Sequence, residues 1–140
     1  MNKLFLCGLA MLSAATLMGC GQKELPSKKP YTVGGQVKLK GDPVAFAILH
    51  FKPVGGGFPA TGYTDKDGTL VGARSFSNTE MDGVVPGEYE VTIEGFDPAS
   101  FMGPSPKEDE KPTEIPAEVA KDKKTVTVEA SDGNQLNIEF

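Results

Sequence analysis

The stretch EYEVTIE at residues 88–94 decides the fold class, because polar and apolar side chains alternate along its whole length. Successive side chains of a β-strand point to opposite faces of its sheet, so this alternation predicts a strand with one face in a core and the other in water. Pro86-Gly87 stands directly before the stretch and marks a turn. The same two-residue period recurs along much of the chain.

Further strands are predicted upstream of this stretch. Residues 33–39 alternate and are expected to form a half-buried strand. Residues 45–51 are largely apolar on both faces, which favours a central strand of a sheet, and Pro53 ends it because a prolyl nitrogen has no hydrogen to donate. Residues 60–64 and 69–73 are predicted to pair as an antiparallel hairpin.

Turn and loop signals separate these segments. Asp65-Lys66-Asp67-Gly68 ends in Asp-Gly, a hairpin signal, and so closes the hairpin just described. Residues 74–85 are rich in Asn, Ser, Asp and Gly and are expected to be irregular. Residues 96–116 hold five prolines and a run of charged side chains, which predicts a long exposed loop. Residues 117–121 follow Pro116 and are expected to form one helical turn.

The end of the chain is predicted to be a last hairpin, in which residues 125–130 and 135–140 pair around the turn at 131–134. Counting all these segments, we expect a single all-β domain at residues 32–140. Its architecture is expected to be a seven-stranded antiparallel β-sandwich of the transthyretin-like or immunoglobulin-like class. A closed barrel would need more even strand spacing than the loop at residues 96–116 allows.

An export signal precedes this domain. Lys3 supplies a basic start and residues 4–18 an apolar run, which is shorter than the roughly 20 residues that a membrane-spanning helix needs. The sequence LMGC at residues 17–20 resembles a bacterial lipobox, in which cleavage before the cysteine exposes its thiol for acylation. We therefore expect residues 1–19 to be a cleaved signal peptide and Cys20 to carry the lipid.

Residues 20–31 are expected to be the lipidated cysteine and a flexible tether, since they are polar and rich in lysine and proline. Two or more acyl chains anchor a protein stably to a membrane. The residue after Cys20 is Gly21, and by resemblance to lipoproteins of Gram-negative bacteria this favours the outer membrane, with the domain facing the periplasm. Exposure on the cell surface remains the alternative.

The charge and the cysteine content of the chain exclude some classes of binding partner and a disulfide bond. The chain has a formal net charge of −5 and two cysteines. Because Cys7 leaves with the signal and Cys20 is acylated, no disulfide is expected within the mature domain. The acidic balance argues against nucleic acid and against anionic lipid headgroups as partners. The expected membrane contact is therefore the lipid anchor alone.

Conventional catalytic and metal-binding motifs are missing. The chain contains one histidine, His50, which is expected to be a surface or packing residue because no second ligand stands at metal-binding spacing. Asp65 and Asp67 resemble part of a calcium loop, but Gly68 occupies the fourth position of that loop and not the sixth. A turn in which an aspartate caps its own backbone explains the same residues. We expect no enzyme activity, no metal and no cofactor.

Five short motifs follow one another in the domain: GQV at residues 35–37, GDPV at 41–44, AILHF at 47–51, TDKDG at 64–68 and VPGEYEV at 85–91. In this order they resemble a carboxypeptidase regulatory-like domain of bacterial lipoproteins. The resemblance implies a transthyretin-like sandwich without catalytic residues.

Two functions follow as hypotheses. The first is a non-enzymatic, membrane-anchored lipoprotein of the cell envelope, whose sandwich is a structural module or binds a protein or glycan. The alternative is a sandwich that binds a small molecule or a metal ion, with His50, Asp65 and Asp67 as ligands.

Overall fold

The computed structural model describes residues 29–76 and 83–140. The predicted signal peptide, Cys20 and the tether up to residue 28 lie outside these ranges, as do residues 77–82 of the segment expected to be irregular. Over the described residues the fold is all-β, and its one helix is the short 3-10 helix η1 (Val119–Lys121), which confirms the helical turn predicted there. No helix in these ranges is long and apolar enough to cross a membrane.

The larger layer is a five-stranded antiparallel sheet. In spatial order it consists of β6 (Leu70–Ser75), β5 (Ala60–Thr64), β4 (Ile48–Pro53), β7 (Gly87–Glu94) and β8 (Lys124–Val128). The strand predicted from EYEVTIE is thus β7, and β4 is central as its two apolar faces indicated. The predicted hairpin of β5 and β6 is confirmed, with Thr64 opposite Leu70 across the turn.

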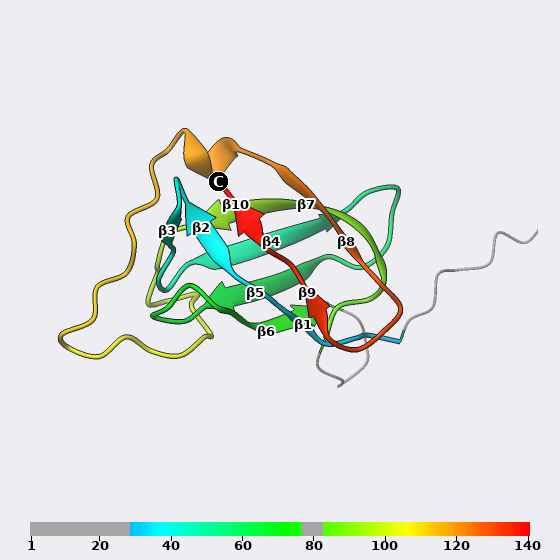
Figure 1. Ribbon diagram of the computed structural model, residues 1–140, viewed down its shortest axis with the longest axis horizontal. Helices are drawn as coiled ribbons and strands as arrows, with labels where there is room; N and C mark the ends of the chain where they lie inside the picture. The colour runs from blue at the N-terminus through cyan, green and yellow to red at the C-terminus, as the bar shows by residue number, and fades with distance from the viewer. Residues whose placement is uncertain (1–28, 77–82) are drawn as a thin grey trace, which may run out of the picture.

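The smaller layer is built from both ends of the described chain. It contains β1 (Val33–Gly34), β2 (Val37–Leu39), β3 (Asp42–Pro43), β9 (Asn134–Gln135) and β10 (Ile138–Glu139). The pairs β1 with β9 and β2 with β10 are parallel and β2 with β3 is antiparallel, so the prediction of a wholly antiparallel sandwich is wrong in this layer, where the two chain ends run in the same direction. Figure 1 shows β2 and β10, in cyan and red, lying in front of the five-stranded sheet.

The predicted last hairpin is wrong. Residues 124–128 form β8, which pairs with β7, whereas residues 134–139 pair with β1 and β2 in the other layer. The buried side chain of Asn134 explains the crossing, because its amide oxygen accepts the Glu129 N–H at 2.8 Å and its amide nitrogen donates to the Ser131 carbonyl at 2.7 Å. These bonds hold the turn in a shape that sends the chain to the second layer.

The predicted count of seven strands is also wrong, since the described residues contain ten strand segments. The predicted strand at residues 33–39 is divided into β1 and β2, and its partner into β9 and β10. Gly35 lies at this division with a φ of 131°, a backbone conformation that glycine alone adopts readily. The register nevertheless continues across the division, because the Leu136 and Ile138 N–H groups donate to the Gly34 and Gln36 carbonyls.

A single hydrophobic core lies between the two layers, which gives the fold a sandwich-like architecture. Its largest fully buried side chains are Tyr89, Phe51 and Leu49 from the five-stranded sheet. Leu136, Ile138 and Phe140 from the C-terminal segment close the core from the other side. The Tyr89 hydroxyl donates to the Val85 carbonyl at 2.6 Å, and burial of this hydroxyl raises the pKa of Tyr89.

Candidate functional site

The candidate site lies on the face of the five-stranded sheet that is turned away from the second layer, which we call the outer face. His50 in β4 stands opposite Thr61 of β5 and Thr92 of β7 in the strand register. Opposed residues of neighbouring strands share a face, so these three side chains form one row across three strands, the polar row. His50 is exposed while Leu49 and Phe51 beside it are buried, so the row faces solvent.

The loop at residues 96–116 covers one end of the outer face. It lacks strands and helices as predicted, but the expectation that it is simply exposed is wrong at Phe101. The ring of Phe101 makes edge-on contacts at centroid distances of 5.0 Å to Phe96, 5.1 Å to Tyr63 and 6.3 Å to Phe46. Such contacts stabilise aromatic clusters beyond the burial of area, so the cluster anchors this loop to the sheet.

Two further contacts hold the loop in place. Thr113 exchanges two hydrogen bonds with the backbone of Ala45, because its hydroxyl accepts the Ala45 N–H at 2.8 Å and its own N–H donates to the Ala45 carbonyl at 2.9 Å. Nearer to Phe101, a Cβ atom on Gly103 would lie 2.8 Å from the Cβ of Tyr63, so the absent side chain lets the loop rest directly on β5.

A β-bulge interrupts the sheet beside the loop. Thr61 stands opposite Arg74 and Tyr63 opposite Val71, so β6 has one more residue than β5 between these two pairs. Gly72 lies within the bulge with a φ of 61°, in the left-handed region. Bulges of this kind redirect the neighbouring side chains and are frequent at functional sites.

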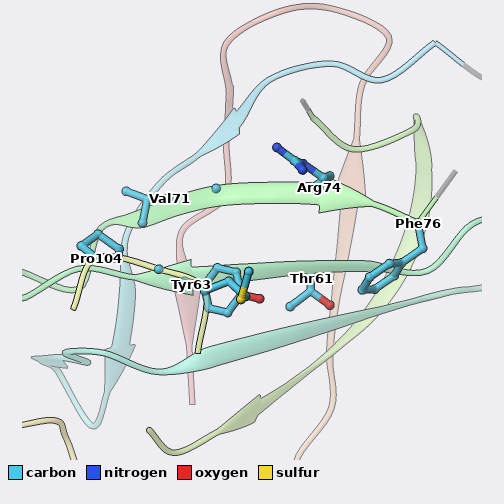
Figure 2. A pocket seen from close by; sticks show the side chains of 9 residues that line it. Thr61, Tyr63, Val71, Arg74, Phe76 and Pro104 are labelled. Atoms are coloured by element: carbon cyan, nitrogen blue, oxygen red, sulfur yellow. The ribbon is translucent and has the colours of Figure 1, made fainter. Parts of the chain in front are cut away.

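A groove of about 510 Å³ lies at the bulge. Thr61 and Tyr63 line it from β5, and Figure 2 shows them following one another toward Phe76. Of the large hydrophobic side chains described, Val54, Phe76 and Met102 are the exposed ones, at 48%, 67% and 81%, and the last two line this groove. Clefts of this size with apolar walls and a few polar groups are typical of ligand sites.

Two glutamates of the outer face have polar side-chain partners. The His50 Nε2 atom lies 2.7 Å from the Glu94 carboxylate, and the Lys123 ammonium lies 3.2 Å from that of Glu90. In the parts of the chain that the structure describes, no three His, Cys, Asp or Glu side chains are placed to hold a metal ion. His50 is therefore a hydrogen-bonding residue of the outer face with a single carboxylate partner.

Asp65 and Asp67, the predicted ligands of the alternative metal site, stabilise their own turn. One carboxylate oxygen of Asp65 accepts the N–H groups of Asp67 and Thr69, both at 2.9 Å, which confirms that this aspartate caps its own backbone. The Asp67 carboxylate accepts bonds from Lys66 at 2.7 and 2.9 Å, and this contact raises the pKa of Lys66. The structure does not group these two residues with His50.

Replacing Asp65 with alanine is expected to lower the free energy of unfolding by about 1–2 kcal/mol, because two backbone N–H groups lose their acceptor. Asp67→Ala is the matched control, and we expect a change within about 0.5 kcal/mol because it removes only an exposed ion pair. Urea denaturation measures both values. Equal effects of the two substitutions would contradict the role given to Asp65.

The residues that line the groove were not predicted as site residues from the sequence. Phe76 and Met102 stand in segments rich in Ser, Gly and Pro, where the isolated Phe76 and the adjacent pair Phe101-Met102 could have drawn attention. Gly72 within a predicted strand was a second available signal, since an isolated glycine in a strand suggests a bulge. Neither signal reveals that the loop and the bulge meet.

Comparisons of the chain with models of protein families, with curated proteins and with solved structures found no match. The fold and the site together define an all-β domain whose polar outer face carries a groove with two exposed apolar side chains. The carboxypeptidase regulatory-like family stays a prediction from the motifs at residues 35–91.

Proposed function

We propose that this chain is a non-enzymatic lipoprotein of the bacterial cell envelope, whose β-domain binds a protein or glycan on its outer face. One observation carries the binding role: Phe76 and Met102 are 67% and 81% exposed and line the same groove. Exposed apolar side chains that gather beside a hollow mark interaction sites more often than scattered ones do.

The sequence supports the anchoring part of the proposal. The stretch LMGC at residues 17–20 follows a basic start and an apolar run, as in lipoprotein signals. After the predicted tether, the chain enters the fold at Tyr31, whose N–H and C=O both bond to Val84 at 2.9 Å. The proposed tether would join the domain at this pair of bonds.

The chemistry of the outer face supports binding over catalysis. A nucleophilic or acid-base mechanism needs a nucleophile or base within hydrogen-bond reach of a second, orienting group. His50 and Glu94, 2.7 Å apart, meet this orienting requirement, but their side chains are 49% and 56% exposed and neither lines the groove. The pair of His50 and Glu94 can hydrogen-bond to a ligand as it stands, whereas an active site would need further catalytic groups beside it.

Cross-linking in living cells tests the proposal. A photo-cross-linking amino acid is placed at position 76 in the groove or, as control, at position 54, where the native valine is also exposed but lies away from the groove. We expect an adduct with an envelope protein or glycan at position 76 and none at position 54. Equal labelling at both positions, or none at either, would refute a binding site in the groove.

The same cells test the proposed location. We propose the outer membrane with the domain facing the periplasm, so protease added to intact cells should leave the protein uncut, and cutting should begin once the outer membrane is permeabilised. Digestion in intact cells would instead place the domain on the cell surface.

A further inference from the structure

We infer that the ligand of the outer face is a neutral oligosaccharide, which lies in the groove and extends over the polar row. This inference rests on the proposed binding function and names its ligand class. Three properties of the outer face support it. Its charges are balanced, it has two exposed apolar side chains, and the backbone N–H and C=O groups of its strands are hydrogen-bonded within the sheet.

The charges of the outer face complement an uncharged ligand. Glu94 pairs with His50 at 2.7 Å, and Glu90 pairs with Lys123 at 3.2 Å. Lys52 stands opposite Glu90 in the strand register, so a second ammonium group lies beside this glutamate. Arg74, the charged residue that lines the groove, is already engaged in an interaction of its own. A polyanion extending over the sheet would meet these carboxylates and the net charge of −5, while a neutral chain meets no repulsion.

The groove and the polar row offer the two kinds of contact that a sugar needs. A sugar ring has apolar faces made of C–H groups, which the exposed ring of Phe76 and the thioether of Met102 can cover. The hydroxyl groups at its rim need hydrogen-bonding partners. Thr61 lines the groove and is also the first member of the polar row, followed by His50 and Thr92, so such partners continue from the groove across the sheet.

The sheet backbone argues against a peptide as the ligand. β5 is paired with β4 and β6, and β4 with β5 and β7, so the N–H and C=O groups of both strands are committed within the sheet. Peptides are usually recognised by adding a strand at a sheet edge. The edge strand that lines the groove is β6, and its Leu70 and Ser75 N–H groups already donate to the Gly35 and Gly83 carbonyls. A sugar chain needs only side-chain partners, which this face provides.

Affinity electrophoresis of the full chain tests the inference. The protein is kept in a polyoxyethylene detergent, because sugar-based detergents would compete for the site. The gels contain neutral polysaccharides (starch, cellulose derivatives, β-1,3-glucan, xylan and mannan) or the polyanions alginate and polygalacturonate. We expect retardation by at least one neutral polysaccharide, undiminished at about 0.5 M salt, where interactions between exposed charges are screened.

Variants connect the retardation to the groove. Phe76→Ala is expected to weaken binding at least about tenfold, while Val54→Ala, an exposed apolar side chain outside this groove, leaves binding unchanged. Because Phe76 is 67% exposed, its replacement should leave the melting temperature within a few degrees of the wild type, which circular dichroism verifies. His50→Ala is expected to weaken binding by a smaller factor.

Each contrary outcome overturns the inference in a recognisable way. Retardation by none of the neutral polysaccharides, retardation by polyanions alone, or equal binding by the folded Phe76→Ala variant would each refute it. A protein adduct at position 76 without polysaccharide binding would refute the inference that the ligand is a glycan, but it would still support the proposed binding function. Loss of adducts at position 76 altogether would remove the proposed function itself.

Discussion

Replacing Gly35 with alanine is expected to lower the free energy of unfolding by at least about 4 kcal/mol. The backbone angle φ of Gly35 is 131°, a value that residues with a side chain rarely adopt. A Cβ atom here would overlap the carbonyl oxygen of Leu136 and lie 2.6 Å from its nitrogen. Since all these are backbone atoms, relief requires the C-terminal strand to move away from the N-terminal one.

Urea denaturation measures this loss, and hydrogen exchange locates it. The amide protons of Leu136 and Ile138 donate to the Gly34 and Gln36 carbonyls at 2.8 and 2.9 Å, so their protection should fall most. Gly41→Ala is the control: its φ of 91° gives a similar backbone strain, but nothing lies within 4 Å of the new Cβ. We expect about 1–2 kcal/mol there, and an equal loss at both positions would disprove the clash.

Replacing Cys20 with serine is expected to abolish acyl labelling and to move the protein out of the membrane fraction. In the proposed lipoprotein the thiol of Cys20 carries the lipid, and a serine hydroxyl would not substitute for it in the proposed lipobox at residues 17–20. Each buried CH₂ group of an acyl chain contributes about 0.8 kcal/mol to membrane binding, so loss of the chains removes stable anchoring. Growth with an alkyne fatty acid followed by fractionation gives both readouts.

Cys7 provides the matched control for this substitution. It lies within the apolar run of the predicted signal, so Cys7→Ser should leave both labelling and membrane association unchanged. Persistent labelling of the Cys20→Ser protein, or loss of labelling in Cys7→Ser, would refute the lipobox assignment.

The strands that local alternation predicted are the ones whose two faces differ most strongly. Residues 87–94 form β7, with Tyr89, Val91 and Ile93 buried and the glutamates turned outward or only partly covered. The turn at residues 65–68 was equally predictable, because the Asp65 carboxylate bonds to N–H groups only two and four residues away. These features depend on residues that are close together in the sequence, so they can be predicted from it.

Pairing between distant segments was not predictable in the same way. The alternation at residues 135–140 is compatible with a hairpin to β8 and with a parallel pair to β1 and β2, because either arrangement buries Leu136 and Ile138. The hydrogen bonds of Asn134 and the absent side chain of Gly35 select the second arrangement. The Asn134 bonds lie within the turn itself, whereas Gly35 meets the Leu136 backbone only when the two ends of the domain come together.

The candidate site depends on tertiary structure even more strongly. Tyr63 and Phe101 are far apart in the chain, and their ring contact at 5.1 Å exists only because the loop after β7 folds back onto β5. His50 was recognised from sequence as the single histidine, but Thr61 and Thr92 become its neighbours through strand register alone.

The sequence by itself therefore determined the all-β class, the central place of β4, the amphipathic β7 and the capped turn at Asp65, and it carries the prediction of a lipid at Cys20. Only the tertiary structure decided that the two chain ends pair in parallel and that a loop and a bulge enclose a groove on the outer face. The physical reason is the distance in sequence over which each interaction acts. Side-chain periodicity and capping are local, while strand partners and grooves arise from packing between segments that the sequence places far apart.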